Sequence, residues 1–422
     1  MTRQQVFQAN MACIHDLLDA LLDRDMVFVD KDRHKSYLLS QLAPRVRLLT
    51  GPGGTTAAAL DSAELAPGDR VFFFKPSFQL NTSARGRGLQ PLQQDIRTRS
   101  FIENKVRFYE RALPTFGPLF PAAVTGTAAD MDFDRVVSKT GLPFVLQFAS
   151  GFSGRSTYLV SSRSQFRDLA AGKRRKAKAS RYVPGTVWTA NGFMHPSWFM
   201  LAPPFEQYTA DHDLTPFALG SCGNLFAQEL PPGHDFAAFS QQVRRLLQHV
   251  AFQGFFGIDF VMQQNRCRLI EVNPRYTTTM SLESEISLLG GTVPCLILDI
   301  LRLGMPAQAQ GWQRVMDQVR HTQKRLKTHL VGRPAQLIVY SRHSAYTPPE
   351  VASGVYRIQD GQLQHISSSP FYHDLDGRAF ALLAPEPGRR IGLGYEVARI
   401  IFDRQQISLQ HVKAAALPLL SP

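Results

Sequence analysis

The sequence predicts a multi-domain chain that combines α/β and α+β units. Its 422 residues are ample for two to four domains with a sizeable hydrophobic core. Helix-type and strand-type hydrophobic patterns alternate over the first hundred residues, which is typical of an α/β unit. Further along, strand pairs stand between amphipathic helices, and short strands and turns dominate the tail. We expect an N-terminal α/β domain at 1–100, a central nucleotide-binding and catalytic domain at 101–305, and a helix plus a small β-rich domain at 306–422.

The net charge is the unusual feature of an otherwise ordinary composition. Hydrophobic residues make up 44% and charged residues 19%, which is globular usage. No apolar run approaches the roughly 18 residues that span a bilayer, and the first residues lack the apolar core of a signal peptide. We therefore expect a cytoplasmic protein without membrane contact. The 47 Lys and Arg against 34 Asp and Glu give a net charge of +13. This excess favours anionic partners, and it leaves nucleotides, acidic small molecules and nucleic acid open.

Cysteine spacing excludes two further classes of protein. The four cysteines form no CxxC pair, and no histidine cluster accompanies them at zinc-binding spacing. We expect free thiols, with neither a disulfide scaffold nor a structural zinc site.

The first hundred residues contain a helix and three strands. Hydrophobic residues recur at 3–4 spacing over 3–24, which predicts an amphipathic helix. Apolar runs at 26–29, 46–49 and 71–74 predict strands. Residues 81–100 are polar and read as a surface connection.

A hairpin with a flexible tip is predicted near residue 150. Strands at 143–148 and 157–160 enclose a loop of small residues, Ala149–Ser156, which is rich in backbone donors. A helical stretch begins near Lys105, upstream of this hairpin. Downstream, residues 172–181 hold six basic residues in ten. We expect a solvated surface run there, with docking of an acidic substrate or of RNA as the alternative.

Two further strands place acidic side chains opposite each other. The strands are predicted at Phe255–Met262 and Cys267–Asn273, after an amphipathic helix, and a turn near residue 265 joins them. In such a hairpin Asp259 faces Glu271, and Asn273 shares the face of Glu271. Like charges directly opposite destabilise a sheet unless a hard cation lies between them, and oxygen ligands of this kind suit magnesium. The alternative is an ion pair with a nearby arginine: Arg266, Arg268 or Arg275.

This hairpin resembles the closing signature of the ATP-grasp superfamily. The likeness rests on Phe256–Val261 and Leu269–Arg275 and covers roughly residues 101–300, where further segments follow in the order of the family. It implies an ATP-grasp fold preceded by a pre-ATP-grasp α/β domain. It also implies a carboxylate–amine ligase that uses ATP and Mg²⁺, with Mn²⁺ as a substitute.

The resemblance implies a role for each matching residue. Asp259, Glu271 and Asn273 would hold magnesium against the ATP phosphates. Arg275 and Glu271 would be catalytic, with Arg275 stabilising the phosphoryl transfer or its acylphosphate. The implied ATP-binding residues are Lys105 and Gln147, then Gly151, Ser153, Gly154, Arg155 and Ser156 of a loop that closes over the phosphates, and Arg181, Tyr182 and Val183 of a hinge strand that reads adenine through its backbone.

Two positions depart from the pattern of the family. Many members have a second lysine where this chain has Gln147, and its loss weakens phosphate binding unless Arg155 or a neighbour replaces the charge. Thr186–Trp188 stands where an acid often contacts ribose. A regulatory ATP-binding protein without catalysis is therefore an alternative to the ligase, although the metal-binding and charge-stabilising groups are all present.

The expected reaction couples a small-molecule carboxylate to an amine through an acylphosphate, with release of ADP and phosphate. A bicarbonate-using carboxylase and an RNA-binding protein that uses residues 172–181 also fit the sequence. The sequence specifies neither the acid nor the amine, and it allows a homodimer without specifying one.

Overall fold

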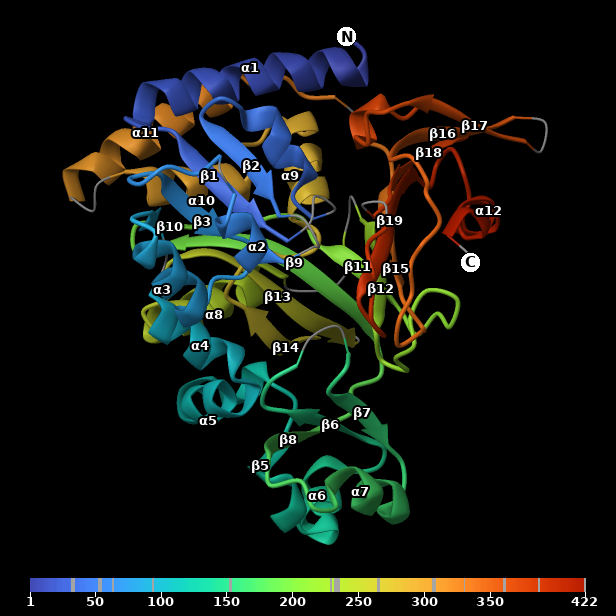
Figure 1. Ribbon diagram of the computed structural model, residues 1–422. Coiled ribbons are helices and arrows are strands. Elements are labelled where there is room, and N and C mark those ends of the chain that lie inside the picture. Colours follow the sequence, from blue (N-terminus) through green and yellow to red (C-terminus); the bar gives the residue numbers. More distant parts are fainter. Residues whose placement is uncertain are drawn as a thin grey trace.

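The computed structural model describes nearly the whole chain. It covers residues 1–31, 35–51, 55–62, 64–92, 95–151, 154–227, 230, 236–263, 266–305, 309–329, 331–359, 362–385 and 388–420, with the side chains of 309 and 310 set aside. Figure 1 shows a broad body that holds both termini and a small lobe that extends below it.

The N-terminal part of the body is a parallel sheet in the order β2-β1-β3-β4. Every residue of β1 is buried, as expected where elements cover both faces of a parallel strand. The predicted α/β pattern is therefore present. The strands are β1 (Met26–Asp30), β2 (Val46–Thr50), β3 (Arg70–Phe73) and β4 (Gln90–Pro91), and the helical elements are α1 (Arg3–Leu21), the 3-10 helix η1 (Tyr37–Leu42), α2 (Thr56–Leu60) and α3 (Phe78–Gly86).

The expectation of a surface connection at 81–100 is wrong. The structure has the end of α3 and the start of α4 (Ile96–Glu103) in this stretch. Ser77 and Asp95 cap the two helices through their side chains. In α3 a single residue, Ala84, is buried, so the hydrophobic periodicity that would reveal this helix is weak.

The small lobe is an antiparallel sheet in the order β5-β8-β6-β7 with two helices on its outer face (Figure 1). Its elements are β5 (Ala123–Thr127), α6 (Phe133–Thr140), β6 (Phe144–Phe148), β7 (Thr157–Val160), α7 (Arg163–Ala170) and β8 (Lys176–Arg181). Phe144, Leu146, Ala177 and Ala179 pack into the core beneath these helices. Since side chains alternate along a strand, the residues between them face the body: Val145, Gln147, Lys178 and Ser180.

A long sheet runs through the rest of the body in the order β14-β13-β9-β11-β12-β15-β19-β18-β16-β17, and β10 pairs with β9. Its strands are β9 (Thr186–His195), β10 (Trp198–Leu201), β11 (Phe205–Thr209), β12 (Ser221–Phe226), β13 (Gly254–Gln263), β14 (Arg266–Asn273), β15 (Pro334–Tyr340), β16 (Gly354–Gln359), β17 (Gln362–Ser367), β18 (Ala379–Leu383) and β19 (Glu396–Asp403). The helices are α5 (Lys105–Phe116), α8 (Phe236–His249), α9 (Met280–Leu289), α10 (Cys295–Gly304), α11 (Ala309–Arg325) and α12 (Leu409–Ala416). Short 3-10 turns complete the chain at Gly117–Leu119, Ala128–Asp130, Tyr372–Asp374 and Pro418–Leu420.

The pairing of β12 with β15 joins the central and C-terminal strands into one sheet. The expected boundary at residue 305 lies just after α10, but strands from both sides of it are hydrogen-bonded neighbours. The division into three domains therefore stays a prediction.

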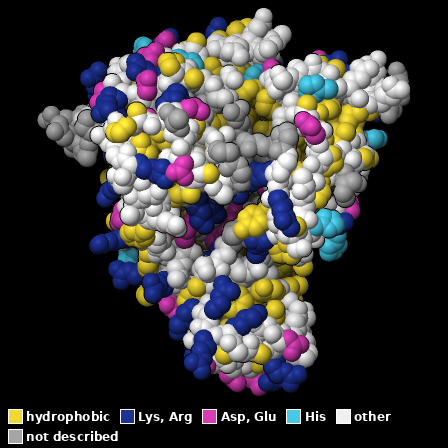
Figure 2. Space-filling view, viewed as in Figure 1, with side chains coloured by type: hydrophobic (Ala, Val, Ile, Leu, Met, Phe, Trp, Pro, Cys, Tyr) yellow, Lys and Arg dark blue, Asp and Glu magenta, His cyan; other side chains and the backbone are white. Residues whose placement is uncertain are grey.

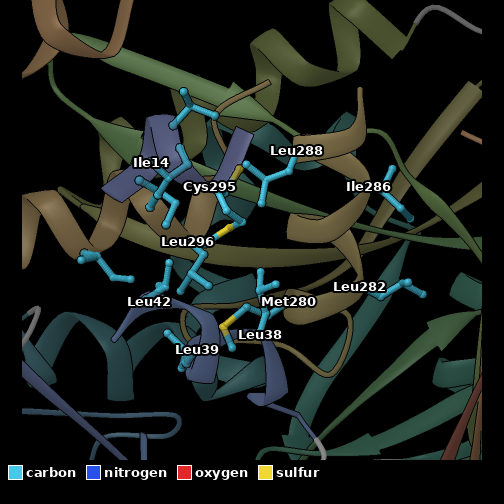
Figure 3. Packing of buried hydrophobic residues seen from close by; sticks show 14 of the residues in the cluster. Ile14, Leu38, Leu39, Leu42, Met280, Leu282, Ile286, Leu288, Cys295 and Leu296 are labelled. Carbon is cyan, nitrogen blue, oxygen red and sulfur yellow. The ribbon is translucent and has the colours of Figure 1, made fainter. Parts of the chain in front are cut away.

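A buried cluster fixes the N-terminal unit to the helices that follow β14. Figure 3 shows residues of this cluster from α1, η1, α9 and α10 pointing toward one another. All ten residues of α9 are buried. Burial of each large apolar side chain contributes about 1.5–3 kcal/mol. The loop that enters α9, residues 274–279, is tied to the central sheet, because the hydroxyls of Thr277 and Thr279 donate to Asn191 Oδ1 on β9.

All four cysteines lie in the described part of the chain. Cys13, Cys222, Cys267 and Cys295 are free thiols, as predicted. Among the described residues, no helix combines the length and apolarity needed to cross a membrane.

Candidate active site

A cavity of about 300 Å³ lies between the small lobe and the central sheet. The body-facing side of β6 and β8 forms one wall, and β13, β14 and the loop residues Thr277–Thr279 before α9 form the other. Figure 2 shows the hollow between lobe and body, with charged side chains of both signs around it. The cavity falls in the size range of small-molecule sites.

The cavity brings together most of the residues that the sequence singles out. Those that line it are Lys105, Gln147, Gly151, Gly154, Ser156, Arg181, Tyr182, Val183, Asp259, Glu271, Asn273 and Arg275. Arg155 is outside this lining, and Ser153 lies outside the described residues.

The β13–β14 hairpin holds the two carboxylates as predicted. Asp259 is directly opposite Glu271 in the ladder. The Nδ2 of Asn273 donates to Asp259 Oδ2 at 3.1 Å and lies 3.3 Å from Glu271 Oε1. Gln207 on β11 donates through Nε2 to Asp259 Oδ1 at 2.7 Å. The register shifts by one residue immediately beyond Asp259, which leaves Ile270 as the extra residue of a β-bulge.

The two opposed carboxylates have very different affinities for a proton. Burial, followed by the negative charge of Glu271, raises the pKa of Asp259 well above its ordinary value. Burial also acts to raise the pKa of Glu271, but the Lys105 ammonium outweighs it and the pKa is lowered. Lys105 Nζ lies 2.6 Å from Glu271 Oε2. The predicted pair of opposed carboxylates is therefore present, and Lys105 is the ionic partner of Glu271.

A second ion-pair group lies beside the first. Arg275 Nη2 donates to Asn273 Oδ1 at 3.1 Å, and Arg275 Nε is 3.2 Å from Glu103 Oε1. Lys75, which follows β3, has its Nζ 3.7 Å from the same Glu103 oxygen. Through Lys75 and Glu103, the N-terminal unit is thus linked to Arg275, which lines the cavity.

The wall formed by the small lobe contains a buried lysine that sequence reasoning missed. Lys178 on β8 is directly opposite Gln147 on β6, and both side chains line the cavity. Burial, with a smaller effect of Lys105, lowers the pKa of Lys178 to about 8. The expectation that 172–181 is a solvated run is wrong for its second half, because Ala177–Ser180 is buried. The alternation of lysine and alanine at 176–179 is the strand-type signal that could have revealed this.

The loop between β6 and β7 touches the body at its C-terminal end. Gly154 has a φ of +77°, and a Cβ there would lie 2.8 Å from Gly220 Cα. Arg155 points to the C-terminal strands: its guanidinium lies 4.6 Å from the Tyr395 ring and donates to the Leu393 carbonyl. The structure therefore places Lys178, and not Arg155, beside Gln147.

The predicted hinge connects β8 to β9 at the inner end of the cavity. Arg181, Tyr182 and Val183 all line it. Gly185 follows with a φ of +154°, and a Cβ at this position would lie 2.2 Å from the Met262 carbonyl oxygen. The close approach of this turn to β13 fixes the lobe against the central sheet.

Comparisons with known proteins address the fold that carries this cavity. Residues 216–279, which contain β12, α8, β13 and β14, match the family model of the ATP-grasp domain. The structure is similar to N5-carboxyaminoimidazole synthase from Aspergillus clavatus in complex with ADP and 5-aminoimidazole ribonucleotide, with 12% identity, a TM-score of 0.55, and coverage of 94% of this chain and 97% of that chain. It is also similar to L-amino acid ligase from Bacillus licheniformis, with 12% identity, a TM-score of 0.55, and coverage of 93% and 96%. Biotin carboxylase from Campylobacter jejuni is similar at 11% identity, with a TM-score of 0.56 and coverage of 96% and 88%. No curated protein sequence matches the chain.

The chain therefore has the ATP-grasp fold, as its sequence predicts. The solved structures to which it is similar are ligases and a carboxylase of this fold, and each resembles the chain over nearly its whole length.

Proposed function

We propose that the protein is an ATP- and Mg²⁺-dependent ligase that joins a carboxylate to an amine and forms ADP and phosphate. One observation carries the proposal. Asp259 and Glu271 oppose each other in one wall of the cavity, and Asn273, Lys105 and Arg275 line the same cavity. This combination of paired acids and cations is suited to phosphoryl transfer, in which the protein mainly positions charge and neutralises it.

The donor set supports a hard divalent cation. In the structure, the neutral Asn273 amide donates a hydrogen bond to Asp259, and the Lys105 ammonium pairs with Glu271. No group of three or more His, Cys, Asp or Glu side chains forms a metal cage among the described residues. Magnesium is commonly held by one or two carboxylates together with substrate phosphates, so the set fits it. Asp259, Glu271 and Asn273 would hold Mg²⁺, or Mn²⁺ as a substitute, and the bound ion would neutralise phosphate charge.

The ATP molecule would extend from the hinge to these carboxylates. Backbone groups of Arg181–Val183 would contact adenine, and the loop around Gly154 and Ser156 would cover the phosphates. The position of these residues in one cavity lining supports this orientation. Lys105 would contact the phosphates from the wall that holds Glu271.

The reaction would proceed in two displacements. A carboxylate oxygen of the substrate attacks the γ-phosphorus, and the bond from that phosphorus to the ADP oxygen breaks. The acylphosphate that forms is attacked at its carbonyl carbon by the amine nitrogen, which loses a proton as phosphate leaves. Arg275, which contacts Asn273 and Glu103, would stabilise the charge that develops on the phosphoryl oxygens.

Release of ADP with defined substrates tests the proposal. Panels of carboxylates and amines are supplied with ATP and Mg²⁺, and product masses are determined. Release of ADP that needs both a carboxylate and an amine, with a product of the mass of their amide, supports the ligase. Release that needs bicarbonate identifies the carboxylase. ATP binding without ADP release across the panel favours the regulatory protein.

An RNA-binding role for the basic run at 172–181 is tested separately, by a filter-binding assay across salt. RNA binding that needs no ATP and falls steeply with salt would support it. Burial of Lys178 and Ser180 removes part of the basic run from the surface, which argues against this role.

A further inference from the structure

Lys178 is a buried cation that faces the candidate active site. Its side chain is 4% exposed and lines the cavity next to Lys105, Gln147 and Glu271. Its strand neighbours Ala177 and Ala179 face the core of the small lobe. The alternation along β8 therefore directs Lys178 into the cavity.

The contacts of Lys178 within the protein are weak for a buried charge. Nζ lies 3.4 Å from the Ile270 carbonyl oxygen, which is longer than a normal hydrogen bond, and 5.6 Å from the centre of the Tyr109 ring. Among the described residues, no carboxylate is in ion-pair distance of this Nζ. Glu271 is nearby, but its carboxylate is paired with Lys105. A buried ammonium is costly unless it is paired, so an anion in the cavity would relieve this cost.

The position of Lys178 explains the glutamine at 147. The two residues are direct cross-strand partners, and the Cβ atoms of such partners are about 4.5–5.5 Å apart on one face of the sheet. A lysine on either strand would therefore extend into the same part of the cavity. Lysines at both positions would repel each other. This chain has a lysine at 178 and a neutral glutamine at 147.

We propose that Lys178 is the second phosphate-binding cation of the site and supplies from β8 the charge that Gln147 lacks on β6. The inference rests on the proposed binding of ATP. Lys105 and Lys178 would contact the polyphosphate from the two walls of the cavity, and Gln147 would donate a neutral hydrogen bond. Arg155 would have no part in this contact, since its guanidinium lies against Tyr395.

A nucleotide series separates this role from a structural one. The dissociation constants of ATP, ADP and adenosine are measured by calorimetry for the wild type and for Lys178→Gln. The loss of one charge-assisted hydrogen bond weakens ATP and ADP binding by about 10- to 100-fold. Adenosine has no phosphate, so its affinity stays within about twofold if Lys178 acts on phosphate. An equal loss for adenosine would show that Lys178 merely supports the fold of the cavity.

A swapped variant tests the geometry itself. Gln147→Lys combined with Lys178→Gln returns the cation to the cavity from the opposite strand, and ATP affinity should recover to within a few-fold of the wild type. Lys176→Gln is the matched control, because Lys176 is exposed on the same strand. It should leave all three affinities unchanged. Thermal unfolding shows whether Lys178→Gln alone folds. If it does not, the swapped variant is used for the test. A tenfold or greater loss of ATP affinity in the swapped variant, with normal adenosine binding, would overturn the proposal.

The outcomes for this residue and for the proposed function are distinct. If the wild type binds ATP and Lys178→Gln binds it equally well, the inference about Lys178 is wrong and the proposed function stands. If the wild type binds none of the three nucleotides, the proposed function is wrong and the inference falls with it.

Discussion

Replacement of Glu271 by glutamine tests the metal site with a change of very few atoms. Glutamine keeps the size of the side chain and removes its charge. In the structure Glu271 opposes Asp259 and is 2.6 Å from Lys105 Nζ. The variant therefore removes one of two opposed carboxylates and leaves a neutral amide oxygen for Lys105. We expect the fold to survive, because the side chain keeps its size and its amide oxygen can still accept a hydrogen bond from Lys105.

The expected magnitude follows from the charge that is lost. A hydrogen bond or contact to a charged group contributes about 1.5–3 kcal/mol, which corresponds to roughly 10- to 100-fold in affinity. The part of ATP affinity that depends on Mg²⁺ should fall by this factor. Turnover should fall by about 100-fold or more, since removal of one group that stabilises transition-state charge commonly costs this much.

Calorimetric titration of ATP with Mg²⁺ and with EDTA measures the first effect without knowledge of the substrate. Glu110→Gln is the control, because Glu110 is an exposed acid on α5. It should behave like the wild type in both conditions. Wild-type turnover and an unchanged Mg²⁺ dependence in Glu271→Gln would show that the metal assignment is wrong.

Three further changes have defined outcomes. Hydrogen exchange of the peptide 151–156 should slow when an ATP analogue and Mg²⁺ are added, because the loop loses backbone freedom on closing; exchange that does not change argues against its role. Gln147→Lys alone should tighten ATP binding and lower the melting temperature of the free protein, because its ammonium faces Lys178; no effect on either would place Gln147 outside the site. Burial raises the pKa of Glu283 from 4.5 to about 7. Between these two pKa values the carboxyl of Glu283 is protonated in the folded state and ionised in the unfolded state. The free energy of unfolding therefore falls as the pH rises from 4.5 to about 7, by about 3 kcal/mol in total. Glutamine at this position cannot ionise. In urea unfolding from pH 4.5 to 7, the free energy of unfolding of Glu283→Gln should therefore rise relative to that of the wild type by about 3 kcal/mol. Parallel pH profiles of the two proteins would contradict the raised pKa of Glu283.

The sequence is most informative where structure is local. The hairpin of β13 and β14 is short-range, and its turn and alternation alone predict that Asp259 faces Glu271, which the structure confirms. The predicted hairpin of β6 and β7 is likewise present. In both cases the partner strand is adjacent in sequence, so few competing pairings exist.

What the sequence missed depends on contacts between distant segments. The pairing of β12 with β15 brings Ile338 and Tyr340 into the cavity lining, and no local pattern indicates which strand β15 will join. The direction of Arg155 is set by Tyr395, which is far away in the chain. Lys178 is a different case, because a local pattern does indicate its orientation. Lysine and alanine alternate at 176–179, which favours a strand with one buried face, whereas the six basic residues at 172–181 favour a solvated surface run.

The absence of a lysine at 147 weighs less against catalysis than the sequence alone suggests. Phosphate recognition depends on where the cation lies in the cavity and not on which strand carries it. Two residues that are direct cross-strand partners extend into the same part of the cavity, so either of them can supply the cation. Gln147 with Lys178 is such an arrangement, and Lys105 and Arg275 are present beside it. These cations surround the two opposed carboxylates of Asp259 and Glu271, one of which has a raised pKa. On the proposed function, the cations would bind a polyphosphate and the paired acids would bind the divalent cation that accompanies it. A catalytic site needs both, and the ADP-release assay separates catalysis from binding of the nucleotide alone.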